Sequence, residues 1–153
     1  MIILTFFVQS CFYFIDQLKT IELNKIVYFD GICNLCNWSV RFIINHDKQR
    51  IFSFASLQSR HAKSNLTYIN GQGIKYDSVV YQDDDIILTK SDAVLKICKQ
   101  LSGGWKLLYI FKIVPSGWRD RLYDIVASNR YQWFGKKDHC MIPAPEIRSR
   151  FLD

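Results

Sequence analysis

In residues 25–46, a short continuous apolar run is followed by a segment whose apolar residues recur with the spacing of a helix. Residues 25–29 (KIVYF) are β-branched and aromatic, and Asp30-Gly31 follows them, which is typical of a buried strand ending in a tight turn. In residues 34–46 (NLCNWSVRFIINH) the apolar side chains recur at the three- and four-residue steps of a helix. The pattern therefore predicts a strand, a turn and a helix over residues 25–46.

The next segments predict a second strand, a short helix and a hairpin. Residues 51–57 (IFSFASL) alternate as a strand does, and a short helix is expected over 57–66. Strands are expected around 77–82 and at 86–89 (IILT). The aspartates at 83–85 lie between them and predict the hairpin turn.

The second half predicts three further helices. The first begins at Lys90 or Ser91 and ends at the Gly103-Gly104 pair. The second is the apolar run 105–114, which stops before Pro115, and the third covers 116–134. Side chains expected to face inward on the first and third of these helices are Ala93, Val94, Ile97, Cys98, Leu101, Trp118, Leu122, Ile125 and Val126.

The order of these elements is β-α-β-α-β-β-α, followed by extra helices. A parallel strand pair crossed by a helix, followed by a hairpin and a helix, is the arrangement of thioredoxin-like α/β folds. We therefore predict this fold class, and it places the Cys33-x-x-Cys36 pair where the first strand turns into the first helix.

Composition fits one globular domain and excludes some functions. The chain has 153 residues, of which 49% are hydrophobic, and a formal net charge of +6. A basic excess over residues 41–63 is most simply a solvated face. Nucleic-acid binding is not expected, because no such motif and no basic stripe interleaved with aromatics is present. Five irregularly spaced cysteines favour a reduced, cytoplasmic protein over a disulfide framework.

Residues 1–15 (MIILTFFVQSCFYFI) are apolar but too short for a transmembrane helix. No basic residue precedes Lys19, which argues against an export signal. We expect a nonessential or mis-started extension that packs as a short helix. A membrane-associated segment and an export signal are the alternatives.

Cys33 and Cys36 have the spacing of a redox pair. Cysteines three residues apart at a helix N-terminus face the same way and can close a disulfide with little backbone movement. The N–H groups of the first turn and the helix dipole favour the thiolate, which is the reactive form. We therefore predict that Cys33, at an exposed helix start, attacks a substrate disulfide, and that Cys36, one turn deeper, resolves the mixed disulfide.

Asp30 precedes Cys33 by three residues. Its carboxylate either caps the turn, which the Asp-Gly pair favours, or accepts a proton from the deeper thiol. Two other interpretations of the cysteines stay open, namely buried structural thiols and half of a zinc site completed by His139 and Cys140. Zinc sites usually combine two paired ligand clusters, so no metal is expected. No flavin or nicotinamide site is indicated, so electrons are expected from another protein or a small thiol.

The sequence VYFDGICNLCNWSVRFI (27–43) resembles the signature of the DCC family of thiol-disulfide oxidoreductases, named for an Asp-x-x-Cys-x-x-Cys motif. The resemblance continues in the segments 77–81, 91–105 and 113–135, and in a C-terminal pattern of Cys140, Pro143 and residues 150–152. It implies a thioredoxin-like domain over 25–153, preceded by an extension over 1–24. It also implies protein-disulfide oxidoreductase activity with Asp30, Cys33 and Cys36 at the named positions, acting on a protein or small-thiol disulfide.

Thioredoxin-like enzymes usually have a cis-proline before the third strand, facing the disulfide. Residues 77–79 (DSV) stand in that place, and a cis bond without proline costs about 3 kcal/mol, so a trans peptide and a different docking groove are expected. Arg119, Asp120, Arg130 and Cys140 are further family positions. Helix salt bridges are the simplest role of Arg119, Asp120 and Arg130, and the alternative places Arg119 or Arg130 beside Asp30 or near the thiolate. Cys140 is expected to be a packed thiol, with a third redox thiol as the alternative. A non-catalytic binding or membrane-associated protein on the same scaffold remains the alternative function.

Overall fold

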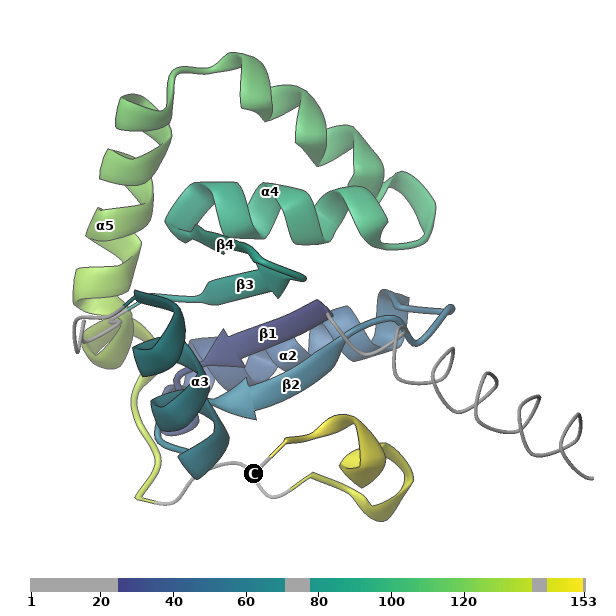
Figure 1. Ribbon diagram of the computed structural model, residues 1–153. Coiled ribbons are helices and arrows are strands. Elements are labelled where there is room, and N and C mark those ends of the chain that lie inside the picture. Colours follow the sequence, from purple (N-terminus) through teal and green to yellow (C-terminus); the bar gives the residue numbers. More distant parts are fainter. Residues whose placement is uncertain (1–24, 71–77, 139–142, 153) are drawn as a thin grey trace, which may run out of the picture.

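The computed structural model describes residues 25–70, 78–138 and 143–152, so the extension 1–24 and the pair His139-Cys140 lie outside the described residues. A four-stranded sheet of order β2-β1-β3-β4 forms the centre (Figure 1). The strands are β1 (Lys25–Phe29), β2 (Ser53–Ser56), β3 (Val80–Asp83) and β4 (Ile86–Thr89). The pair β1–β2 is parallel, and the other neighbours are antiparallel.

Helices follow the strands in the expected order. They are α2 (Asn34–His46), α3 (Arg60–Asn70) and α4 (Lys90–Gln100), and then η1 (Gly103–Ile113), α5 (Ser116–Phe134) and η2 (Pro145–Arg150). The predicted mixed α/β, thioredoxin-like order βαβαββα with additional C-terminal helices is confirmed. Within the described ranges, no helix combines the length and the apolar character needed to cross a bilayer.

The apolar run of β1 is buried on both faces of the sheet. Val27 and Phe29 belong to the core cluster shared with α2 and α4, whereas Ile26 and Tyr28 belong to the cluster shared with α3. A strand that is covered on both faces needs a continuous apolar run rather than an alternating one. This explains the sequence KIVYF and fixes the position of Asp30, which follows the strand directly.

Most predicted boundaries lie close to those observed. The second strand is shorter than expected, and α3 begins at Arg60 because Ser59 caps it: the Ser59 Oγ accepts a hydrogen bond from the Ala62 N–H at 3.1 Å. The apolar run after Gly104 is a 3₁₀-helix, η1, rather than part of an α-helix. Cys98 is buried in the core, as predicted.

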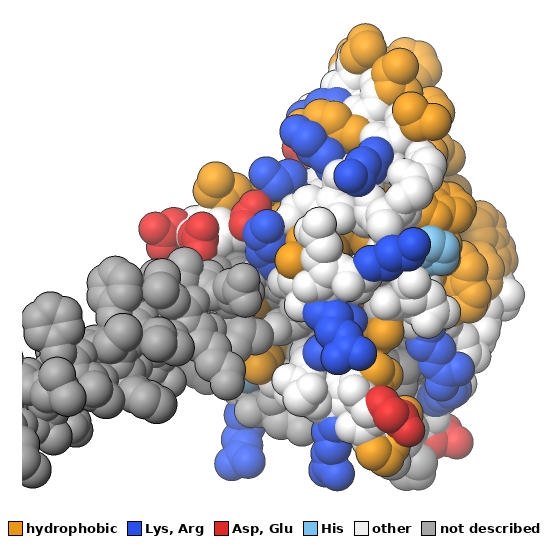
Figure 2. Space-filling model, turned by 90° about the vertical axis from the view of Figure 1, so that its right-hand side faces the viewer, with side chains coloured by type: hydrophobic (Ala, Val, Ile, Leu, Met, Phe, Trp, Pro, Cys, Tyr) orange, Lys and Arg blue, Asp and Glu red, His pale blue; other side chains and the backbone are white. Residues whose placement is uncertain are grey.

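The prediction of which side chains face inward was wrong for part of the C-terminal half. Val94 is exposed while its neighbour Leu95 is buried, and Trp118, Leu122 and Ile125 of α5 are exposed. Neither η1 nor α5 contains a buried residue. Figure 2 shows the resulting apolar surface at the top of the molecule, where η1 meets α5, and along one edge below it.

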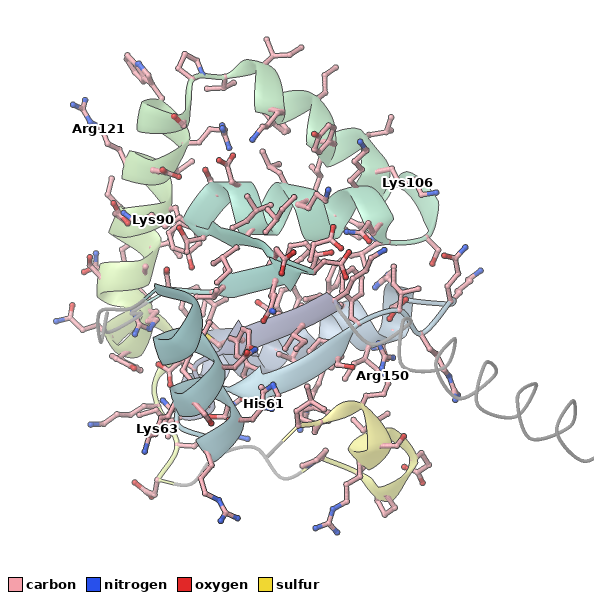
Figure 3. All side chains as sticks on the ribbon, viewed as in Figure 1. His61, Lys63, Lys90, Lys106, Arg121 and Arg150 are labelled. Atoms are coloured by element: carbon pink, nitrogen blue, oxygen red, sulfur yellow. The ribbon has the colours of Figure 1, made fainter. Side chains whose placement is uncertain are left out.

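The C-terminal segment is held to the edge strand by a buried ion pair. The Leu152 N–H donates to the Phe54 carbonyl at 2.8 Å, and Phe151 packs edge-on against Phe29. Arg150 lies beside the start of β2 (Figure 3) and forms an ion pair with the buried carboxylate of Asp47. Its guanidinium also donates to the Phe52 carbonyl at 3.0 and 3.1 Å.

Replacing Arg150 tests how much this attachment stabilises the fold. Arg150→Ala leaves the Asp47 carboxylate buried without its cation, so we expect the free energy of unfolding to fall by about 3 kcal/mol. Urea denaturation followed by circular dichroism measures the change. Arg148→Ala, an exposed position in the same segment, is the matched control. An equal and small loss in both variants would contradict the prediction.

Candidate active site

Cys33 caps the N-terminus of α2 with its own sulfur. The residue has extended backbone angles (φ −79°, ψ 125°), and its Sγ accepts a hydrogen bond from the Cys36 N–H at 3.4 Å. The Asn37 N–H donates to the Cys33 carbonyl at 3.0 Å, and the Asn37 side chain donates to the Gly31 carbonyl at 2.9 Å. The turn and the first helical turn therefore hold the Cys33 sulfur over N–H groups that favour a negative charge.

Cys36 has a raised pKa, which decides where the proton of the pair lies. Burial raises the pKa of Cys36 to about 12, and the hydrogen bond and negative charge of Cys33 add to the effect. The nearby Asp30 carboxylate raises this pKa further, while the Arg130 guanidinium opposes it. Cys36 therefore keeps its proton at neutral pH.

The expectation that Cys33 is exposed was wrong, because the residue has 0% of its surface exposed, whereas Cys36 is half-buried. The segment after α5 covers it: Cys33 and Lys136 form an antiparallel β-bridge. The Asn34 N–H donates to the Gly135 carbonyl at 3.3 Å, and the Lys137 N–H donates to the Ile32 carbonyl at 2.8 Å. We call residues 135–137 the covering segment.

The Asp30 carboxylate accepts hydrogen bonds on both oxygens. Oδ1 accepts from the Ile32 N–H at 3.2 Å and from Gln58 Nε2 at 3.0 Å. The first of these contacts is the predicted cap of the turn. Oδ2 faces Arg130 Nη2 at 3.4 Å and accepts a hydrogen bond from the Tyr131 hydroxyl. Asp30 therefore joins the end of β1 to the last turns of α5.

Of the two arginines that the sequence placed near Asp30 as an alternative, Arg130 makes that contact. Arg119 instead bonds Ser91 and Asp92 of α4, each at 2.9 Å, which is the simpler structural role. Asp120 likewise accepts hydrogen bonds from Ser91. Cys140 lies outside the described residues.

The Tyr123 side chain of α5 contacts the backbone just before β3. Its hydroxyl accepts a hydrogen bond from the Val79 N–H at 3.0 Å, where a thioredoxin-like enzyme usually has its cis-proline. Burial raises the pKa of Tyr123, and the charge of Cys36 contributes in the same direction. No peptide bond among the described residues is cis, as expected for the Ser78-Val79 bond; Asp77 lies outside them.

Sequence reasoning did not identify Gln58, Tyr123, Tyr131 or the covering segment. Tyr131 lies 101 residues from Asp30 in the chain, so no local spacing relates them. The sequence contained one indication of Tyr123 and Tyr131, because both lie in residues 113–135, which resemble a segment of the DCC family. Among the described residues, no three His, Cys, Asp or Glu side chains gather as metal ligands.

A cysteine pair at the N-terminus of the first crossover helix defines the class of this protein as a dithiol protein on a thioredoxin-like fold. Residues 27–136 match the family model of the DCC1-like thiol-disulfide oxidoreductases, and the chain belongs to that family. It is 45% identical over 129 residues to the uncharacterized protein YuxK of Bacillus subtilis, covering 84% of this chain and 94% of YuxK. It is 40% identical over 120 residues to the chloroplastic DCC family protein At1g52590 of Arabidopsis thaliana, covering 78% of this chain and 70% of that protein. No solved structure matches the chain.

The raised pKa of Cys36 predicts slow alkylation of this thiol. In the reduced protein, the rate at which iodoacetamide labels Cys36 should keep rising above pH 9 and approach half-maximum near pH 12. Asp30→Asn removes a negative charge, so the labelling curve should move to lower pH. Mass spectrometry of labelled peptides gives both curves, with Asp85→Asn at an exposed position as control. If the labelling rate of Cys36 in the wild type reached half-maximum at or below pH 9, the raised pKa of Cys36 would be contradicted.

Gly135 has φ 75° and ψ 174°, a conformation that is essentially restricted to glycine, and an added Cβ would lie 3.2 Å from the Asn34 amide nitrogen. Gly135→Ala should therefore destabilise the covering segment by about 2 kcal/mol. We expect faster alkylation of Cys33 at neutral pH. Gly117→Ala, where the added Cβ meets no atom within 4 Å, is the control. Unchanged Cys33 labelling in Gly135→Ala would show that the segment does not restrict access.

Proposed function

We propose that this protein exchanges the Cys33–Cys36 dithiol with substrate disulfides. The observation that carries the proposal is the division of roles between the two thiols. Cys33 Sγ caps α2 and accepts the Cys36 N–H, while burial raises the pKa of Cys36 to about 12. The family name describes the same reaction class, and nothing in it specifies a substrate.

The exchange has two displacement steps. The Cys33 thiolate attacks one sulfur of a disulfide R–S–S–R′, forming Cys33–S–S–R and releasing R′S⁻. Cys36 then loses its proton, which passes to the solvent or to the released thiolate. The Cys36 thiolate attacks Cys33 Sγ, so that the Cys33–Cys36 disulfide forms and RS⁻ leaves with the electron pair of the broken S–S bond; over both steps the substrate disulfide is reduced by two electrons and the dithiol is oxidised by two. A small thiol or a second dithiol protein reverses these steps to restore the reduced state.

The groups around Cys33 and Cys36 support the same order of steps, with Cys33 reacting first and Cys36 second. Burial and the charges of Cys33 and Asp30 raise the pKa of Cys36, and the Arg130 guanidinium lowers it. Cys36 therefore loses its proton more readily once the negative charge on Cys33 is removed. Forming the mixed disulfide neutralises the Cys33 thiolate and so removes its contribution to the raised pKa of Cys36. The covering segment must leave Cys33 before a substrate can reach it, because Cys33 is fully buried when the segment is paired.

Redox titration with trapping tests this mechanism. The protein is equilibrated in glutathione buffers of graded potential, alkylated and mapped by mass spectrometry. Cys33 and Cys36 should gain and lose two electrons together. Cys36→Ser should accumulate a mixed disulfide on Cys33, and Cys33→Ser should not form one on Cys36 at neutral pH.

Cys98→Ser is the control, because Cys98 is a core residue on α4. It should titrate and react like the wild type. If Cys33 and Cys36 never pair, or if mixed disulfides accumulate on Cys36 in Cys33→Ser, the proposed mechanism is wrong.

A further inference from the structure

The 3₁₀-helix η1 has its apolar and polar sides in the opposite arrangement to a normal surface helix. A 3₁₀-helix has three residues per turn, so side chains three apart align in straight rows. One row of η1 is Leu107, Ile110 and Ile113, which are 76%, 65% and 82% exposed. The row that contains Lys112 and Tyr109 meets α4 instead: Lys112 forms an ion pair with Asp92 at 2.7 Å, and Lys99 lies 4.4 Å from the Tyr109 ring centroid.

The helix α5 shows the same inversion. Its contacts with the rest of the domain include the polar pairs Arg119 to Asp92, Tyr123 to Val79 and Asp124 to Lys90. Its exposed side includes Trp118, Leu122 and Ile125. The two consecutive elements make these polar contacts together with the edge-on packing of Trp105 in η1 against Phe42 of α2, whose ring centroids are 4.7 Å apart, and both elements have exposed apolar side chains.

We define the apolar crest as Leu107, Ile110, Phe111, Ile113, Trp118 and Leu122, all exposed. Figure 2 shows apolar side chains forming a narrow projection at the top of the molecule, where η1 meets α5. An amphipathic helix normally turns its apolar stripe inward, and a contiguous exposed apolar patch marks a site of interaction. Within residues 25–70, 78–138 and 143–152 the crest side chains are exposed, which makes them available to a partner.

Charge and shape favour a lipid surface as that partner. Over residues 103–122, which contain the crest, the charged residues are basic except for one: Lys106, Lys112, Arg119 and Arg121 against Asp120. Lys112 and Arg119 are paired with Asp92, so Lys106 and Arg121 are the basic residues considered for a partner. Figure 3 shows Lys106 and Arg121 directed away from the domain on either side of the arch formed by η1 and α5.

Two further features distinguish a bilayer from a protein partner. Trp118, which is 73% exposed, follows the apolar run, and tryptophan is enriched where proteins meet the membrane interface. Five of the six crest side chains have no hydrogen-bonding group, whereas specific protein interfaces make regular hydrogen bonds. The crest also projects from the surface, which suits insertion among lipids.

We propose that the apolar crest inserts into the boundary between headgroups and acyl chains of an anionic membrane, with Lys106 and Arg121 at the headgroups. Such insertion reaches roughly 5–10 Å into the bilayer and needs no spanning helix. From Trp118 to Tyr131 α5 rises by about 20 Å, so the attached protein holds its dithiol away from the lipid. The proposal does not depend on the redox mechanism.

The test uses the full chain and vesicles of phosphatidylcholine with phosphatidylglycerol. Flotation and tryptophan fluorescence with brominated lipids measure binding and insertion. We expect Ile110→Glu to weaken binding at least about tenfold, because a carboxylate replaces a membrane-inserted side chain. Ile86→Glu is the matched control: Ile86 is 59% exposed in the hairpin, against 65% for Ile110. Lys106→Glu should weaken binding to anionic vesicles and reduce its dependence on salt.

Three results would overturn the proposal. The first is an absence of binding to these vesicles. The second is equal binding by Ile110→Glu and Ile86→Glu, which would assign membrane affinity to another part of the chain. The third is self-association in light scattering that Ile110→Glu abolishes without any lipid binding, which would assign the crest to a second copy of the chain.

Discussion

The Asp30 carboxylate is the contact on which the arrangement of the site depends. It ends the central strand, caps the turn before the cysteines and holds Arg130 and Tyr131 of α5. The Asp30 and Arg130 side chains are largely buried, and a buried charge is tolerated only with a partner of opposite sign and satisfied hydrogen bonds. This requirement fixes the last turns of α5 beside the cysteine pair. The covering segment, which follows α5 directly, is thereby brought over Cys33.

This arrangement places the two cysteines in different surroundings. The thiol with the greater exposure, Cys36, is the one whose pKa is raised, and the sulfur that caps the helix is fully covered. The more exposed sulfur is therefore the one that keeps its proton, and the sulfur that caps α2 lies beneath the covering segment.

The helices η1 and α5 differ from the core elements in the interactions that attach them to the domain. The central strands and α2, α3 and α4 bury apolar side chains in two clusters, one on each face of the sheet. The elements η1 and α5 bury no residue. Ion pairs and hydrogen bonds join them to α4, to Asp30 and to the loop before β3, and Trp105 of η1 packs edge-on against Phe42 of α2. Their apolar sides consequently remain available, and the same helix that completes the dithiol site also contributes to the apolar crest.

The sequence by itself determined the features that depend on local periodicity. The strands at 25–29 and 86–89, the helices at 34–46 and 116–134 and the position of Cys33-x-x-Cys36 at a helix start all follow from spacing, turn residues and propensity. Tertiary structure decided which side of a helix faces inward. Periodicity identifies an apolar stripe on α5 but assumes that the stripe is buried, and here polar pairing with α4 and Asp30 overrides it. It also decided that Cys33 is covered, because residues 135–137 reach the start of α2 from 100 positions away along the chain, as the contact between Asn34 and Phe134 shows. No local pattern records a contact between residues so distant in sequence, since only the packed chain brings them together.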